Sequence, residues 1–132
     1  MARRRPLVVT ALASGSGKTV LTLGLAAALR RRDLAVQPFK VGPDYLDPAW
    51  LSMAAGRPAL NLDTHLMGEL GVRASVARAL ADDPIALVEG VLGLCDGRLG
   101  SDGDASTAAV ARLIGARLLV VVDIAGTART AA

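Results

Sequence analysis

A short glycine-rich loop is the clearest chemical signal in the sequence. Residues 14–19 follow an apolar run and precede an apolar segment with helical spacing. In such a loop, backbone N–H groups and the helix start bind phosphate, a lysine reaches the β- and γ-phosphates, and a hydroxyl binds Mg²⁺. The residues predicted to contact ATP are Ser14, Gly15, Ser16, Gly17, Lys18 and Thr19, the last also binding Mg²⁺. The strict pattern G-x-x-x-x-G-K-[ST] requires a glycine five residues before Gly17, and this chain has Leu12 there. The pattern is therefore not fully met.

A second group of polar residues follows the next apolar run, residues 34–40. Asp44 and Asp47 lie there, in a segment too rich in proline, glycine and aspartate to continue a strand. The carboxyl ends of parallel strands meet at one edge of a sheet, so this segment is expected beside the phosphate loop. Carboxylates in that place suit Mg²⁺ binding or substrate positioning. Asx-turns beside the neighbouring prolines are an equally open interpretation.

Carboxylates also follow two later apolar runs. Glu89 directly follows the apolar run at residues 85–88. P-loop enzymes commonly keep a second Mg²⁺-directed carboxylate at the end of such a strand, and we assign Glu89 that role. Asp96 lies further on, in the glycine-rich stretch 90–105, and is either a catalytic contact or a solvated turn residue. Asp123 is the last residue of the apolar run at residues 118–123. The favoured interpretation is that its side chain caps the following turn.

Other polar and aromatic residues are weaker candidates. His65 is the sole histidine, and a structural or exposed role is favoured over substrate contact. Cys95 lacks an evident activating base and is interpreted as a small apolar residue. Tyr45 and Trp50 are expected to pack the loop, although a large flat substrate would favour contact with that substrate instead.

The apolar pattern predicts alternating strands and helices. Strands are expected at residues 7–13, 34–40, 85–88 and 118–123, and helices at 18–31, 49–55, 68–80 and from Ser106 or Thr107 to Leu113. This order indicates an α/β fold of the P-loop NTPase type, with an open, mostly parallel sheet and helices on both faces. The sheet is expected to be incomplete at the C-terminus.

Composition restricts the class of protein. The chain has 132 residues, 52% of them apolar, but a single Trp, Tyr and Phe, which is typical of helices packed on a parallel sheet. The apolar runs are far shorter than the roughly 20 residues of a membrane span. One cysteine excludes an intramolecular disulfide and fits the cytoplasm. Arginines cluster at 3–5 and 30–32 without interleaved aromatic residues, which argues against nucleic-acid binding.

These blocks together resemble the cobyrinic acid a,c-diamide synthase family, whose members also act on hydrogenobyrinic acid and, in some, on a nickel sirohydrochlorin. The similar segments are residues 10–19, 39–50, 56–58, 61–63, 66–68 and 87–97. Lys-Val-Gly-Pro-Asp-Tyr-x-Asp-Pro at residues 40–48 is far more specific than the phosphate loop. The sequence departs from the family at Ala11, where glycine is usual, and at Cys95, where tyrosine is common.

The resemblance implies an ATP-dependent amidoligase of cobalamin biosynthesis. In that family ATP phosphorylates a corrinoid side-chain carboxylate, and ammonia displaces the phosphate to give a carboxamide. By analogy, Thr19, Asp44 and Glu89 form the Mg²⁺ set, Asp47 and Asp96 contact substrate or intermediate, and Lys18 stabilises the transferred phosphate. Residues 1–132 correspond to the N-terminal part of the synthetase domain. No glutaminase domain is expected in the chain, so ammonia would come from a glutaminase elsewhere.

Other interpretations remain open at this point. A ligase similar to dethiobiotin synthetase shares the loop and the fold, but is not expected to carry the motif at 40–48. A partition-type ATPase switch often has a second lysine near the start of its phosphate loop, where this chain has Ala13 and Ser14. A homodimer that supplies missing strands is a further arrangement the sequence leaves open.

Overall fold

Strands and helices alternate along the part of the chain that the structure describes. The computed structural model describes residues 4–97 and 105–131, and all structural statements below refer to these residues. The elements are β1 (Leu7–Ala11), α1 (Lys18–Arg30), β2 (Val36–Val41), α2 (Leu46–Ala55), β3 (Leu60–Leu62), α3 (Thr64–Ala79), β4 (Ile85–Glu89), α4 (Thr107–Leu113), β5 (Arg117–Val121) and the short 3₁₀ helix η1 (Arg129–Ala131).

The strands form one five-stranded sheet in the order β3-β2-β4-β1-β5, and every pair is parallel. This confirms the predicted α/β fold with an open parallel sheet. In the register of the sheet, Glu89 of β4 lies opposite Lys40 of β2 on one side and opposite Val9 of β1 on the other. The ends of β1, β2 and β4 are therefore adjacent, and the loops that follow these strands meet at one edge.

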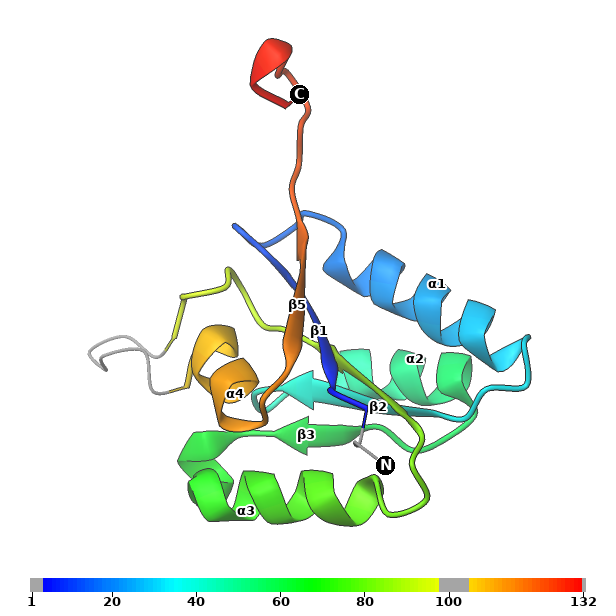
Figure 1. Cartoon of the computed structure of the whole chain (residues 1–132). Helices are drawn as coiled ribbons and strands as arrows, with labels where there is room; N and C mark the ends of the chain where they lie inside the picture. Colours follow the sequence, from blue (N-terminus) through cyan, green and yellow to red (C-terminus); the bar gives the residue numbers. More distant parts are fainter. Residues whose placement is uncertain (1–3, 98–104, 132) are drawn as a thin grey trace.

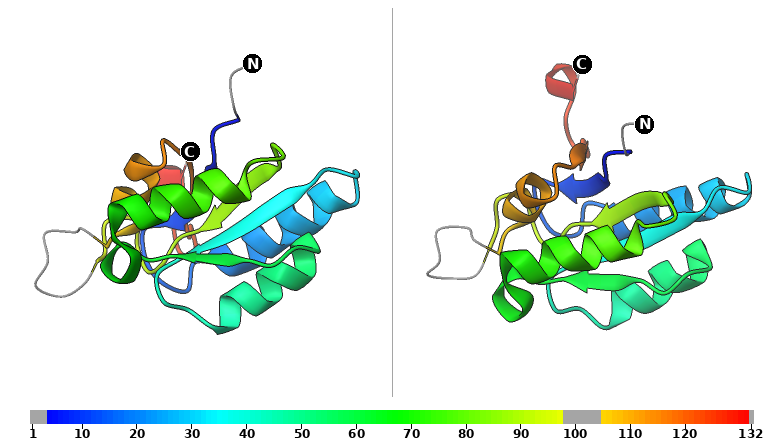
Figure 2. Two further views of the ribbon diagram at one scale, coloured as in Figure 1. Left: turned by 90° about the horizontal axis from the view of Figure 1, so that it is seen from below. Right: turned by 60° about the horizontal axis from the view of Figure 1, so that its bottom comes forward.

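Helices cover both faces of the sheet, as the sequence predicts. Helices α1 and α2 lie on one face and α3 and α4 on the other (Figures 1 and 2). Adjacent strand residues point to opposite faces, so Val9 and Leu87 pack with Ala26 of α1, whereas Val8 and Val88 pack with Val76 of α3. Burying each such Val or Leu side chain contributes roughly 1.5–3 kcal/mol before the entropy cost of ordering it.

Three elements differ from the sequence prediction. Strand β3 is only three residues long and was not predicted, because so short a run carries no periodic signal. Helix α2 begins at Leu46 rather than at residue 49, since the side chain of Asp44 accepts hydrogen bonds from the N–H groups of Leu46 and Asp47. Helix α3 begins at Thr64 and breaks at Gly68, the residue where we expected the helix to start.

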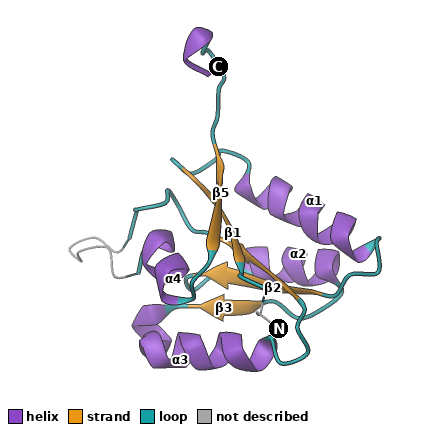
Figure 3. Cartoon of the chain, viewed as in Figure 1, coloured by secondary structure: helices purple, strands orange, loops and turns teal. Residues whose placement is uncertain are grey.

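The remaining elements match the predictions with small shifts. Strand β1 ends at Ala11 rather than residue 13, and β2 and β5 are displaced by one or two residues. Ser106 caps α4 as predicted, accepting a hydrogen bond from the N–H of Ala109. In the glycine-rich stretch 90–105, the described residues form neither helix nor strand (Figure 3), and residues 98–104 lie outside the described part.

Strand β5 lies at one edge of the sheet with exposed apolar side chains. Leu118 and Val120 point to one face and Leu119 to the other, and each is more than a third exposed. The chain beyond β5 extends away from the sheet to η1 (Figure 1). None of the helices in the described part of the chain has the length and apolar character needed to span a bilayer.

Candidate functional site

The phosphate loop joins β1 to α1 and has the backbone shape that phosphate binding needs. Gly15 and Gly17 adopt positive φ angles of 75° and 91°, which L-residues with a side chain rarely adopt. Gly17 is the N-cap of α1, and no side chain caps that helix. The hydroxyl of Ser16 turns back to donate to the carbonyl of Ala13, at 2.9 Å. The N–H groups and the positive dipole end of α1 are thus left for an anion.

Lys18 and Thr19 begin α1, directly behind this loop. Lys18 is only 8% exposed, although its side chain lines an open cavity. Thr19 lies one residue further on, and its hydroxyl donates a hydrogen bond to Oε1 of Glu89. The start of α1 is therefore bonded directly to the end of β4, which fixes the threonine hydroxyl beside a buried carboxylate.

The turn between β2 and α2 places two further carboxylates at the same edge. Oδ1 of Asp44 accepts from the N–H groups of Leu46 at 2.9 Å and Asp47 at 3.2 Å, so the predicted Asx-turn is present. Both aspartates nevertheless line the cavity behind the phosphate loop. Asp44 therefore makes the Asx-turn and lines this cavity as well.

Asn61 of β3 holds this turn in place and was not predicted as a site residue. Its side-chain amide donates to the carbonyls of Gly42 at 2.9 Å and Asp44 at 2.8 Å. Strand β3 lies next to β2 in the sheet, which brings the asparagine to the turn. No local sequence signal could identify this role, because it depends on a strand too short to predict.

Lys40 begins the motif at residues 40–48, but the sequence pattern gave it no individual role. Its ammonium Nζ lies 2.9 Å from Oδ2 of Asp47, 3.6 Å from Oε1 of Glu89 and 4.0 Å from Oδ2 of Asp44, and donates to the carbonyl of Gly90 at 3.0 Å. The residue is 3% exposed. A compositional signal was available: the sequence holds thirteen arginines but only two lysines, and both line this cavity.

Glu89 is the most deeply buried acid of the site, with 1% of its surface exposed. Burial raises the pKa of its carboxyl above the ordinary value of 4.5. The hydrogen bond from Thr19 and the charge of Lys40 oppose this rise, whereas the charge of Asp47 adds to it. Oε2 of Glu89 is buried without a hydrogen-bond partner among the described residues, which leaves one carboxylate oxygen for a ligand.

Most of the predicted site residues line one cavity of about 470 Å³. Its lining comes from the phosphate loop, the start of α1, the turn after β2 and the end of β4. The lining residues are Ser14, Gly15, Gly17, Lys18, Thr19, Val20, Lys40, Asp44, Asp47, Glu89, Val91 and Leu92. A cavity of this size can hold the phosphates of a nucleotide together with a second reacting group.

Asp96 is not brought into this cavity. Its Oδ2 accepts from the N–H of Gly93 at 2.9 Å, so the side chain makes a turn within its own loop. It lines a neighbouring, mostly apolar cavity of about 260 Å³, which shares Val91 and Leu92 with the first. The structure therefore separates Asp96 from the other four predicted catalytic residues by the wall that Val91 and Leu92 form.

The weaker candidates are placed as follows. His65 is exposed in the first turn of α3, and Asp123 caps the turn after β5 by accepting from the N–H of Ala125 at 2.8 Å. Cys95 is exposed rather than a packed apolar residue. The expectation that Tyr45 and Trp50 pack the loop is wrong, since they are 90% and 56% exposed.

The residues available for Mg²⁺ are the hydroxyl of Thr19 and the carboxylates of Asp44 and Glu89. These are hard oxygen ligands of the kind Mg²⁺ prefers, and the unpartnered Oε2 of Glu89 fits such a ligand. In the described part of the chain, however, no three acidic, histidine or cysteine side chains are grouped in a way that could hold a metal by themselves. The donor set fits Mg²⁺ only if part of the coordination comes from phosphate or water.

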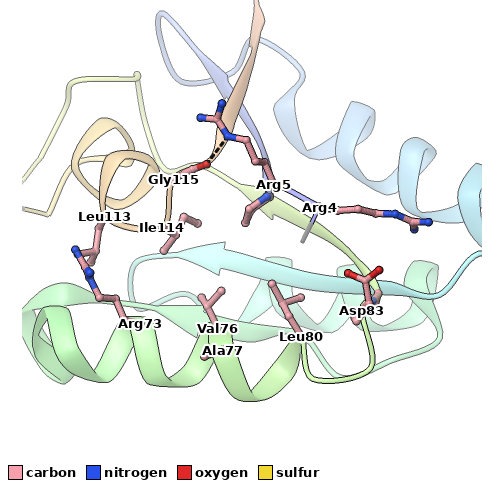
Figure 4. A pocket seen from close by; sticks show the side chains of 12 residues that line it. Arg4, Arg5, Arg73, Val76, Ala77, Leu80, Asp83, Leu113, Ile114 and Gly115 are labelled. Carbon is pink, nitrogen blue, oxygen red and sulfur yellow. Dashed lines mark hydrogen bonds between the residues drawn. The ribbon is translucent and has the colours of Figure 1, made fainter. Parts of the chain in front are cut away.

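A third cavity, of about 340 Å³, lies at the opposite edge of the sheet between α3 and α4 (Figure 4). Its floor is apolar, from residues such as Val76, Leu80 and Ile114. Arg5 at its rim points away to donate to the carbonyl of Gly115 at 2.8 Å. None of the predicted site residues lines this cavity.

A parallel sheet with a glycine-rich loop between β1 and α1, and with carboxylates at the ends of its strands, defines a P-loop nucleotide-binding domain. The family comparison agrees. The sequence model of the CobQ/CobB/MinD/ParA nucleotide binding domain matches residues 7–126, and the chain belongs to this family.

Several proteins with assigned functions are similar to the chain. A cobyrinate a,c-diamide synthase from Syntrophotalea carbinolica is 56% identical over 126 residues, covering 96% of this chain and 28% of that protein. Hydrogenobyrinate a,c-diamide synthases from Mycobacterium tuberculosis and Thermobifida fusca are 49% and 47% identical, each over 96% of this chain. The chain spans about 28% of the length of these relatives.

Among solved structures, chloroplast FtsY from Physcomitrella patens is similar in fold. The TM-score is 0.57 at 15% sequence identity, and the match covers 91% of this chain and 41% of that one. At this identity the likeness concerns the fold alone.

Proposed function

We propose that this chain is the ATP-binding part of an amidoligase that converts the a and c side-chain carboxylates of cobyrinic or hydrogenobyrinic acid into carboxamides. It would correspond to the N-terminal part of the synthetase domain. Ammonia would be supplied by a glutaminase domain or partner, and the pathway would be cobalamin biosynthesis. The names and the 47–56% identity of the relatives support this proposal.

The observation that carries the proposal is the meeting of two lysines and three carboxylates in one cavity behind the phosphate loop. Transfer of a phosphoryl group to a carboxylate brings several negative charges together, so cations must offset their repulsion. Lys18, with the N–H groups at the start of α1, is placed to bind the phosphates. Lys40 supplies positive charge from the end of β2.

Each residue of the cavity would have a separate role in the proposed reaction. A carboxylate oxygen of the acceptor attacks the γ-phosphorus, the bond to the ADP oxygen breaks, and ammonia then attacks the acyl carbon and releases phosphate. Thr19, Asp44 and Glu89 would hold Mg²⁺, which when bound neutralises phosphate charge. Asp47 would position the acceptor. Asp96 lies beyond Val91 and Leu92 and would act only on parts of the substrate that extend over that wall.

The rim of the cavity favours a large acceptor with apolar faces. Tyr45 of the turn after β2 is 90% exposed, and Leu46 at the start of α2 is 75% exposed. Leu66 and Met67 of α3 line an adjoining hollow of about 280 Å³ with Tyr45. Exposed apolar side chains gathered beside a polar cavity are typical of ligand-binding surfaces. They suit a macrocycle whose carboxylate side chain reaches toward the phosphates.

Mass spectrometry of the pigment tests the proposal. The chain is mixed with Mg-ATP, ammonia and either cobyrinic or hydrogenobyrinic acid, beside a version extended through the remaining length of the relatives. The mass change of each acid-to-amide conversion is expected at least in the extended version, accompanied by ADP and phosphate. Absence of amide from both versions with both acids would reject the proposal.

A binding measurement tests the share of the function assigned to this chain. Calorimetric titration with Mg-ATP is expected to show binding by the chain itself. If the extended version forms amide but this chain binds no nucleotide, the proposed amidation activity is supported. The proposal that residues 1–132 bind ATP by themselves is then wrong.

A further inference from the structure

The three carboxylates at the nucleotide cavity converge on an ammonium group of the protein itself. Nζ of Lys40 lies 2.9 to 4.0 Å from carboxylate oxygens of Asp47, Glu89 and Asp44. Asp44 and Glu89 are the acids assigned above to a divalent cation, and Asp47 shares the same ammonium with them. The place among them is thus held by a lysine of the same chain.

Lys40 is fixed in this position by the sheet. It belongs to β2 opposite Glu89 of β4, and the ammonium also donates to the carbonyl of Gly90 at 3.0 Å. The ammonium therefore makes one hydrogen bond to the backbone and an ion pair with Asp47 at 2.9 Å. The side chain is 4% exposed, so moving it into solvent would break these contacts and leave the buried carboxylate of Glu89 without this counter-charge.

The charges near Lys40 nearly balance without a metal ion. Asp44, Asp47 and Glu89 carry up to three negative charges, and Lys40 and Lys18 carry two positive ones in the same cavity. A divalent cation entering alone would meet the ammonium at close range, and repulsion between such charges is strong in a partly buried site. Nucleotide phosphates would add the negative charge that makes a second cation favourable.

We propose that Lys40 is an internal counter-ion that keeps the acidic cluster from binding a divalent cation until a nucleotide is present, so that Mg²⁺ enters together with the phosphates. This inference rests on the Mg-nucleotide site of the proposed function. It agrees with the finding that the described acids form no metal site by themselves, and the unpartnered Oε2 of Glu89 is available to a cation that arrives with the phosphates.

Metal titration without nucleotide tests the role of Lys40. The complete chain and its Lys40→Met variant are titrated with Mn²⁺ and followed by electron paramagnetic resonance, with Mg²⁺ as competitor. The variant removes the charge but keeps the unbranched stem. Its Mn²⁺ affinity is expected to exceed that of the original chain by at least about tenfold, because a unit charge within 4 Å of the acids no longer opposes the metal.

Three further variants make the result specific. Lys40→Arg keeps the charge and is expected to bind Mn²⁺ as weakly as the original chain. Lys18→Met removes the other cation of the cavity, which forms no ion pair with these acids among the described residues, and should change the affinity far less than Lys40→Met. Lys40→Gln repeats the charge removal with a polar side chain. Equal or weaker Mn²⁺ binding by folded Lys40→Met or Lys40→Gln would overturn the proposal.

A measurement on the unaltered chain keeps the idea testable if the variants do not fold. With only two lysines in the sequence, ¹⁵N-lysine labelling gives two side-chain ammonium signals. The Lys40 signal should be unaffected by Mg²⁺ alone and should shift when Mg²⁺ is added with a non-hydrolysable ATP analogue. A shift with Mg²⁺ alone would overturn the inference. The metal titrations contain no nucleotide or corrinoid. A negative result in them would therefore count against the role of Lys40 and would not bear on whether the extended protein forms amide.

Discussion

The hydroxyl of Thr19 donates a hydrogen bond to Oε1 of Glu89, and this bond links the start of α1 to the end of β4. The two residues are seventy positions apart in the sequence. Strands β1 and β4 are neighbours in the sheet, which brings the phosphate loop beside the strand end that carries Glu89. The contact joins the phosphate-binding half of the cavity to its acidic half.

Replacement of Lys18 by alanine should abolish or strongly weaken nucleotide binding while leaving the fold intact. Lys18 lines the cavity at the start of α1, and charge-assisted contacts to phosphate are among the stronger hydrogen bonds. Calorimetric titration with Mg-ATP should show at least about a tenfold loss of affinity. Arg31→Ala, which removes an exposed cation at the other end of α1, serves as the control. Unchanged affinity in Lys18→Ala would remove the basis for the nucleotide site.

Replacement of Glu89 by glutamine should change how stability depends on pH. Burial raises the pKa of Glu89 in the folded chain, so the folded state holds this proton more tightly than the unfolded state. The associated stability is complete below the ordinary pKa of 4.5 and is lost as pH rises through the raised value. Glutamine cannot ionise, so the Glu89→Gln variant does not lose this stability over that pH range.

Denaturant unfolding of both chains from acidic to neutral pH measures this effect. The free energy of unfolding of Glu89→Gln minus that of the original chain should increase with pH and then level off. A difference that decreases with pH would mean that the Thr19 and Lys40 contacts outweigh burial, and that the pKa of Glu89 is lowered instead.

Replacement of Asn61 by alanine should loosen the turn that carries Asp44. The amide of Asn61 donates to two carbonyls of that turn, so its loss should cost about 1–2 kcal/mol of stability and weaken Mg-nucleotide binding. Gln37→Ala is a matched control, because the Gln37 amide also donates to two carbonyls, those of Pro38 and Pro58, and neither belongs to the turn that carries Asp44. If both variants affect nucleotide binding equally, the effect of Asn61 is one of general stability.

Strand β5 should make the chain self-associate. It is an edge strand whose exposed Leu118, Leu119 and Val120 present apolar surface on both faces, a feature that favours pairing with another chain. Sedimentation velocity should show association that increases with concentration and is reduced in Val120→Lys. Leu70→Lys, at an 83% exposed position on α3, should leave it unchanged. A chain that stays monomeric at all concentrations would contradict the prediction.

Much of the fold follows from local sequence patterns. Apolar runs of strand length and the helical spacing between residues 18 and 31 predicted β1, α1 and the alternating order, because burial against a sheet leaves such periodicities in the sequence. The phosphate loop and the acids at strand ends were found for a related reason. Parallel strands bring their carboxyl ends to one edge, so Asp44, Asp47 and Glu89 could be placed near Lys18 without coordinates.

Only the tertiary structure decided what each of these side chains contacts. The order of the strands in the sheet determines which loops meet. The sequence does not show that β2 pairs with β4, which is the pairing that brings Lys40 to Glu89. The same holds for Asn61, whose role depends on a three-residue strand. Asp96 shows the converse: glycines around it let its loop close on itself, so a carboxylate close in sequence to Glu89 lies beyond a wall of the cavity. Sequence periodicity records burial, whereas contacts between side chains are set by strand order and loop closure.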